Sequence, residues 1–211
     1  ILQFGGEIYF EHQLTDISIG SHGVQGISVN GQPWPCALLV LATGHSARDT
    51  FQMLLKRGVS MQAKAFAVGV RIEHHQEQIN AAQYGDASLA KLLQNATYQL
   101  TCHLNGRSCY SFCMCPGGSV VASASEPGMV VTNGMSEYAR DRDNANSALV
   151  VSVTPEDFMS SSPLAGVAFQ RQWEQLAFRA GGGQYCAPVQ RVEDFMLSRP
   201  STTWGNIIPT Y

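Results

Sequence analysis

An Asn-Gly pair at residues 105–106 constrains the fold of this chain more than any other feature, because this pair is typical of a two-residue β-hairpin loop. Both residues tolerate the positive φ angles of a type I′ turn. Apolar residues alternate over residues 98–104, and a second strand pattern follows over 107–115. The loop length fixes the register, with three facing pairs: Leu104 and Arg107, His103 and Ser108, and Cys102 and Cys109.

The outgoing strand of this hairpin, SCYSFCMC, is rich in thiols. Strand alternation predicts one face formed by Cys109, Ser111, Cys113 and Cys115. Pro116 ends the strand because it lacks a backbone donor, and Gly117-Gly118 allows another group to approach the backbone closely. Cys115, at the strand end, is expected to be more exposed than Cys113.

Three explanations compete for the cysteines. Zinc is disfavoured, because Cys113 and Cys115 form a Cys-x-Cys pair without a second pair or a positioned histidine, so no metal site is predicted. A disulfide between Cys102 and Cys109 fits their facing positions but not a reducing compartment. Buried structural thiols and the wall of a ligand cavity remain as alternatives.

The composition limits the partners of the chain. Only 14% of its 211 residues are charged, against about 25% in an average globular domain. The shortfall predicts surface covered by other parts of a longer polypeptide or by a second copy. The net charge of −3 argues against binding of nucleic acid or an anionic membrane. No apolar run reaches the roughly 18 residues of a membrane helix, and six cysteines are too few for a disulfide scaffold. A cytoplasmic protein is therefore expected.

The first part of the chain contains short strand patterns, at residues 7–12, 16–19 and 24–29, with a second Asn-Gly turn at 30–31. The continuous apolar run 37–42 predicts a strand buried on both faces of a parallel sheet. A helix is expected to follow, with Ser46 as N-cap and Gly58 as the residue after its end. Ligands bind beyond the carboxyl ends of such strands, which makes residues 43–46 a candidate ligand edge.

The rest of the chain predicts alternating antiparallel strands and helices. Strands are expected at residues 66–73, 98–104, 107–115, in a hairpin over 119–133, and at 148–153. Helices are expected at 76–85, 87–94, 163–180 with Ser162 as N-cap, and 188–197. The fold class is therefore mixed α+β and α/β. No GxGxxG motif follows any strand, so the usual clamp for a dinucleotide pyrophosphate is missing from these 211 residues. The opening ILQFGGEIYF, without methionine or signal peptide, predicts a start within a longer protein.

Several stretches together resemble the bacterial FAD-dependent dehydrogenases, also called FAD-dependent oxidoreductases. They are, in order, LATGHSARDTF, AVGVRIEH, YSFCMCPGG with VVASASE, NGMS, NANSALVV, LAGVAFQRQWE and QRVEDF. Members of that family begin with a Rossmann unit that carries a glycine fingerprint, and they end with a second glycine-rich flavin segment. Neither occurs here, so the resemblance implies the central portion of such an enzyme.

The resemblance also implies an organisation into three parts. Residues 1–58 would be part of a Rossmann-like FAD-binding domain, 59–195 an inserted substrate or cap domain, and 196–211 a return toward the FAD domain. Residues expected near the cofactor are Thr43, Gly44, His45, Ser46, Pro116, Gly117 and Gly118. Cys115 and Cys113 are the candidate catalytic residues.

The implied function is oxidation or reduction of a small molecule by bound FAD, with NADH or NADPH as a candidate electron donor. The 211-residue chain by itself is expected to bind FAD weakly and to be inactive. Two alternatives remain open: a non-catalytic recognition or interaction module, and a redox sensor that works through Cys113 and Cys115.

Overall fold

The structure is a computed structural model that describes residues 1–206 and 209. It divides into two compact units, one of residues 1–63 with 162–167, the other of residues 64–161 with the described residues from 168 on. The first boundary lies five residues beyond the position expected from the sequence. Within the described part of the chain, no helix is long and apolar enough to cross a membrane.

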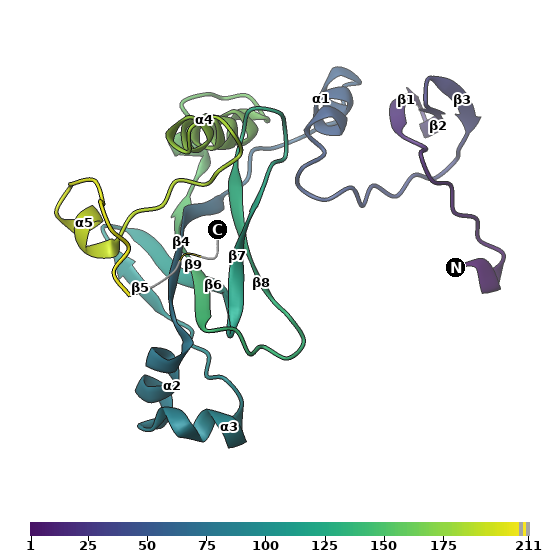
Figure 1. The fold of residues 1–211 in the computed structure, drawn as a ribbon. Helices are drawn as coiled ribbons and strands as arrows, with labels where there is room; N and C mark the ends of the chain where they lie inside the picture. The colour runs from purple at the N-terminus through teal and green to yellow at the C-terminus, as the bar shows by residue number, and fades with distance from the viewer. Residues whose placement is uncertain (207–208, 210–211) are drawn as a thin grey trace. The chain divides into compact units, whose positions relative to one another are not determined.

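The first unit contains a three-stranded antiparallel meander (Figure 1). Its strands are β1 (Leu14–Gly20), β2 (Gly23–Val29) and β3 (Gln32–Pro35). The short helix η1 (Leu2–Phe4) precedes them. Asn30 and Gly31 both have positive φ, at 50° and 79°, so the predicted Asn-Gly turn between β2 and β3 is confirmed.

Two strands predicted for the first unit are wrong. Residues 7–12 are irregular, and the apolar run 37–42 is not a strand. Leu38 and Val40 in that run are 84% and 80% exposed. A strand needs neighbours that satisfy its N–H and C=O groups, and none of the described strands lies beside this run. The apolar side chains of this run therefore have no sheet in the described chain that would bury them.

Helix α1 (Arg48–Lys56) follows, and it packs against β1. Its N-cap is Ala47 and not Ser46, without a side-chain cap. Gly58, with φ of 76°, has the left-handed conformation predicted for the residue that ends this helix. Arg57 forms an ion pair with Asp16 of β1, which joins the end of the helix to the meander.

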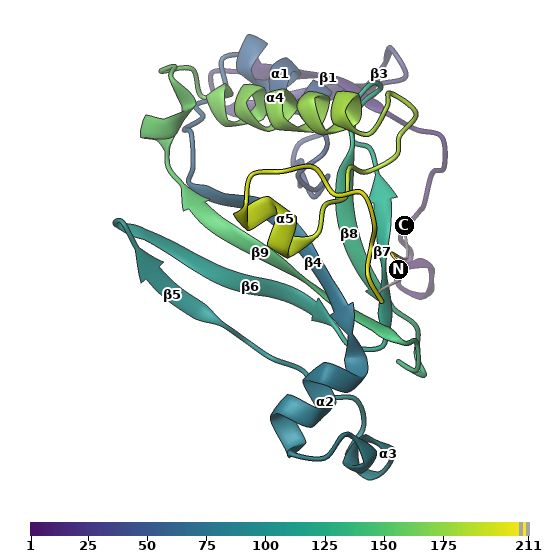
Figure 2. The same ribbon diagram turned by 60° about the vertical axis from the view of Figure 1, so that its left-hand side comes forward.

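The second unit is built on a four-stranded antiparallel sheet of order β4-β9-β6-β5 (Figures 1 and 2). Its strands are β4 (Phe66–His75), β5 (Thr101–Leu104), β6 (Arg107–Cys115) and β9 (Asn144–Val153). The β5–β6 hairpin has the predicted register, including the Cys102–Cys109 pair. Asn105 and Gly106 have φ of 50° and 76°, as the type I′ turn requires. The order of the strands depends on long-range pairing, which no sequence pattern indicated.

A two-stranded ribbon, β7 (Gly118–Ser123) with β8 (Val131–Ser136), packs against this sheet. Helix α4 (Ala165–Ala180) lies across the end of the sheet where β4 begins (Figure 2). Phe66 of β4 stacks on Phe158, and both rings contact Phe169 of α4. The predicted helix is confirmed, but it begins after Leu164, whose N–H donates to Ser162 Oγ (3.2 Å). This aromatic cluster joins the helix to the sheet.

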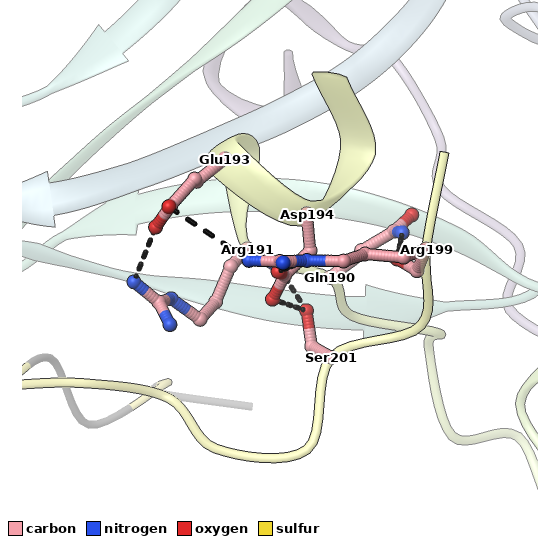
Figure 3. Close-up of polar contacts among 6 residues, drawn as sticks. All are labelled: Gln190, Arg191, Glu193, Asp194, Arg199 and Ser201. Carbon is pink, nitrogen blue, oxygen red and sulfur yellow. Dashed lines mark hydrogen bonds and ion pairs between the residues drawn. The ribbon is translucent and has the colours of Figure 1, made fainter. Parts of the chain in front are cut away.

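Short helices complete the unit. They are α2 (Gln76–Tyr84), η2 (Ala87–Leu89), α3 (Ala90–Leu93), η3 (Pro155–Phe158) and α5 (Val192–Met196). The helix predicted over 188–197 is therefore shorter than expected. The chain folds back after α5, and the buried carboxylate of Asp194 accepts hydrogen bonds from Arg199 Nε (2.6 Å) and Ser201 Oγ (2.8 Å) (Figure 3). These bonds hold the described start of the predicted return segment within the second unit.

Candidate functional site

The predicted cofactor residues Thr43, Gly44, His45 and Ser46 form an exposed segment of the first unit, directly before α1. Gly44 has φ of 75°, and His45 Nε2 lies 3.3 Å from Ser46 Oγ. Since the run before them is not paired in a sheet, the described chain does not form the expected strand edge. Contact between these four residues and FAD stays a prediction.

The cysteine strand β6 contains a β-bulge that the sequence analysis did not anticipate. Cys113 has φ of 46°, in the left-handed region. Phe112 and Cys115 pair with alternate residues of β9, so two residues of β6 oppose the single Ser147. The extra residue shifts the alternation by one, and Cys115 shares a face with Phe112 instead of Ser111. The prediction that Cys113 and Cys115 point the same way from a regular strand is therefore wrong.

The exposure of the two candidate catalytic thiols is the reverse of that expected. Cys113 is exposed, whereas Cys115 is half-buried. The Cys115 thiol donates to the carbonyl oxygen of Cys113 (3.4 Å), across the bulge. Both are free thiols. The more accessible sulfur thus belongs to Cys113, although a catalytic role for either residue stays a prediction.

The turn after β6 is enclosed by its own protein. Pro116, Gly117 and Gly118 are all buried. A Cβ atom on Gly117 would overlap the carbonyl oxygen of Arg140, and one on Gly118 would overlap that of Met135. Close backbone packing therefore requires both glycines, and the turn does not present the open glycine surface that the sequence suggested. Their contact with a cofactor stays a prediction.

A buried network of amide side chains fixes this turn. Gly117 N–H donates to Gln76 Oε1 (2.8 Å) at the start of α2. The Gln76 amide donates to Asn80 Oδ1 and to the carbonyl oxygen of Ala96 (both 2.9 Å). Ser136 Oγ of β8 donates to the carbonyl oxygen of Pro116 (2.8 Å). The turn is thus bound to the helix and to the ribbon, which gives the end of β6 a defined position.

A cluster of polar groups lies beside the bulge, between the four-stranded sheet and the β7–β8 ribbon. We call it the Arg71 cluster, formed by Arg71 of β4, Asn146 of β9, Gly134 of β8 and the Cys113 carbonyl. Arg71 Nη1 donates to Asn146 Oδ1 and to the Cys113 carbonyl (3.3 Å). A Cβ atom on Gly134 would overlap both of these side chains. Asn146 is completely buried, whereas asparagine is mostly exposed in folded proteins.

His74 and Tyr98 form a second polar pair in this unit. His74 Nε2 and the Tyr98 hydroxyl lie 2.8 Å apart. Burial lowers the pKa of His74, while burial raises the pKa of Tyr98 against the opposing effect of a hydrogen bond with Ser147. Strand alternation directs His74 away from the face that carries Arg71, but the positive charge of Arg71 also lowers the pKa of Tyr98, so this pair lies within electrostatic reach of the Arg71 cluster.

The sequence analysis missed the Arg71 cluster, although its residues lie within quoted motifs. Arg71 belongs to AVGVRIEH, Cys113 to YSFCMCPGG, Gly134 to NGMS and Asn146 to NANSALVV. In the strand predicted at residues 66–73, Arg71 alternates with apolar residues, and no role was assigned to it. The sequence feature that could have indicated the cluster is the pair of asparagines at 144 and 146, at the start of a strongly apolar strand. In the part of the chain that the structure describes, no group of three or more His, Cys, Asp or Glu residues could hold a metal ion.

The fold and this cluster define an α+β domain with a polar centre formed by four sequence motifs that converge from separate strands. Residues 65–211 match the family described as "FAD-dependent protein, C-terminal domain-like". The chain therefore belongs to this family of FAD-dependent proteins. The match begins within two residues of the start of the second compact unit.

A relative supports the same relationship. An uncharacterized protein of Clostridium beijerinckii (strain ATCC 51743 / NCIMB 8052) is 56% identical over 213 residues, which cover 100% of this chain. The chain spans 40% of the length of that relative.

Proposed function

We propose that this chain is the central part of an FAD-dependent oxidoreductase of the dehydrogenase class, which acts on a small molecule. The family match over residues 65–211 is the observation that carries the proposal. The substrate or cap domain would correspond to the second compact unit. The 40% share of the relative's length supports the view that further segments supply the rest of the cofactor site.

The first unit supports this proposal through its exposed apolar run. Leu38 and Val40 have side chains suited to a buried strand, yet they are largely exposed. Partner strands from other parts of the longer polypeptide would cover them and would convert residues 43–46 into the carboxyl edge of a parallel sheet. In that sheet Thr43, Gly44, His45 and Ser46 would lie next to FAD.

Bound FAD would supply hydride chemistry, and the residues of this chain would position the reactants. The Pro116–Gly118 turn is held rigidly by Gln76 and Ser136, so the thiols that precede it have fixed positions. Rigid placement is what a site needs if it is to orient a substrate and to exclude water. NADH or NADPH as the electron donor, a small-molecule substrate and a cytoplasmic location are parts of the same proposal.

The test is the visible spectrum of the complete polypeptide that contains this chain. We expect the two absorption bands of an oxidised flavin at near-stoichiometric content. Anaerobic addition of NADH or NADPH should bleach the lower-energy band. A colourless, folded protein that takes up no added FAD would overturn the proposal.

The accessible Cys113 thiol beside Cys115 favours the redox sensor as a second candidate. Cys113→Ser and Cys115→Ser, made in the complete polypeptide, separate the two functions. An oxidoreductase that uses one of these thiols should lose NAD(P)H-driven turnover and retain its flavin. A sensor should retain turnover and lose only its response to added peroxide, as thiol titration would show. Unchanged behaviour in both assays would leave both cysteines structural.

A further inference from the structure

The guanidinium group of Arg71 has one edge in use and one edge without an acceptor. Nη1 donates to Asn146 Oδ1 and to the Cys113 carbonyl. Nε is buried and has no hydrogen-bond partner within residues 1–206 and 209. Among the described residues, Arg71 also forms no ion pair, although the arginines at 57, 107, 142, 171, 191 and 199 each have a carboxylate partner. Because an arginine remains charged at any ordinary pH, this half-buried cation is without an ion-pair partner in the described part of the chain.

Asn146 supplies another donor at the same place. The residue is 0% exposed, and its Nδ2 atom has no hydrogen-bond partner among the described residues. Its Oδ1 is held by Arg71, so the amide group cannot rotate without losing that bond. A completely buried NH₂ group without an acceptor is costly, and it requires either a ligand or a bound water.

The neighbouring carboxylate does not fill this role. Glu73 lies two residues along β4, on the same face as Arg71. It accepts a hydrogen bond from Asn144 Nδ2 (3.0 Å), and the ion pairs found among the described residues do not include one between Glu73 and Arg71. The cluster therefore combines a fixed positive charge with donors from two strands, and it lies against the bulge at Cys113.

We propose that the Arg71 cluster binds the carboxylate group of a small-molecule substrate. The free Nε edge of a guanidinium presents two parallel N–H groups that match the two oxygens of a carboxylate. Asn146 Nδ2 adds a third donor. One cation with three donors suits a singly charged carboxylate better than a phosphate, whose larger charge and additional oxygens need more partners. The inference rests on the proposed oxidoreductase function, because it names the substrate class for that site.

Such a carboxylate would hold the substrate beside the candidate thiols. Arg71 Nη1 donates to both the Cys113 carbonyl and Asn146 Oδ1. A carboxylate bound to the same guanidinium would therefore be separated from the bulge only by the Arg71 side chain. Gly134 leaves room for the Arg71 and Asn146 side chains themselves, since a Cβ atom there would overlap both. The absence of a side chain at position 134 is therefore required by the Arg71 cluster as well as by strand β8.

Nitrogen-15 NMR of the arginine Nε–H groups tests the inference directly. We would titrate the 211-residue chain, and then the complete polypeptide, with acetate and separately with inorganic phosphate. Arg71→Lys assigns the Arg71 signal by its loss. We expect acetate to shift that signal saturably, and phosphate to shift it less at equal concentration. Arg142→Lys, which changes an arginine already paired with Glu137, should leave the acetate response unchanged.

Asn146→Asp gives the decisive comparison. The new carboxylate still accepts from Arg71, so the variant should fold, but it supplies the missing counter-charge and removes the Nδ2 donor. Acetate should bind it at least about tenfold more weakly, which corresponds to about 1.4 kcal/mol. An unchanged acetate response in this variant, or no response of Arg71 in the parent protein, would contradict the inference and leave a buried water as the partner. If the complete protein bound acetate at Arg71 but contained no flavin, the proposed anion site would stand and the proposed oxidoreductase function would be contradicted.

Discussion

At the scale of single residues, Gly117 shows why a glycine pair that looks like a ligand wall has an internal role. Its φ of 48° lies in the left-handed region, and any Cβ would overlap the backbone oxygen of Arg140. Its N–H is also bound to Gln76. Position 117 therefore needs a glycine for two reasons: the backbone has a positive φ, and there is no space for a Cβ atom.

We predict that Gly117→Ala strongly destabilises the protein. Gly106 is the matched control, because it too has a positive φ but an added Cβ would have no atom within 4 Å. Gly106→Ala should cost about 1–2 kcal/mol from the left-handed conformation alone. Gly117→Ala should cost about 1–3 kcal/mol more, from overlap with a backbone atom that has little room to move. Urea unfolding of both variants measures the difference, and equal losses would show that the turn is looser than its contacts indicate.

At the scale of elements, the short helix α5 is stabilised mainly by its link to the segment that follows it. Five residues are too few for a helix to be stable by itself. Arg191 N–H donates to Ser201 Oγ (2.9 Å), and Gln190 Nε2 donates to the carbonyl oxygen of Arg199 (2.6 Å) (Figure 3). The Asp194 carboxylate lies at the centre of these bonds, so the helix and the segment should form and unfold together.

The Asp194 link should make stability depend on pH in the acid range. Hydrogen bonds from Ser201 and then from Arg199 lower the pKa of Asp194. A carboxyl group whose pKa is lowered in the folded state contributes stability above its unfolded pKa, near 4, and the contribution is lost as the pH falls through the folded value. Asp194→Asn should therefore be less stable than the wild type at pH 6, with a smaller difference at pH 3.

Chemical denaturation at the two pH values measures this effect. Ser201→Ala is the informative comparison, because it removes the donor that contributes most to the lowered pKa. We expect it to show a reduced change between pH 6 and pH 3. If Asp194→Asn and the wild type lost stability in parallel over this range, the carboxylate would not be held as the structure shows.

At the scale of the whole molecule, the two compact units differ in how many of their predicted strands are paired in a sheet. In the second unit every predicted strand has a partner, and the ribbon and helices cover the sheet. In the first unit the strongest apolar run, 37–42, is unpaired and largely exposed. We therefore expect the first unit to depend on segments that these 211 residues do not contain.

Substitution of Leu38→Glu and Val40→Glu together tests this dependence. In the 211-residue chain, charges on an exposed apolar run should reduce aggregation with little effect on unfolding. In the complete polypeptide the same change should lower flavin content and stability, because unpaired charges would enter a buried strand. Leu92→Glu is the control, since Leu92 is 83% exposed in α3 of the second unit and should be tolerated in both. Equal tolerance of the double variant in both proteins would argue against a buried strand here.

Much of the local structure was determined by the sequence alone. The Asn-Gly loops at 30–31 and 105–106 gave the hairpins their turns, and the second gave the correct facing of Cys102 and Cys109. Helices α1, α2 and α4 followed from apolar spacing and from glycines such as Gly58 at their ends. These features depend on neighbours within a few residues, so local backbone preferences and side-chain periodicity suffice to predict them.

The candidate site was decided only by the tertiary structure. The bulge at Cys113 depends on pairing of β6 with β9, about 35 residues away, and one extra residue there moved Cys115 to the other face. Arg71 became a half-buried cation because β8 packs over it with a glycine at position 134. Neither the one-residue change of register nor the packing of the β7–β8 ribbon over Arg71 can be predicted from a local sequence pattern, because both arise from contacts between strands that are remote in sequence.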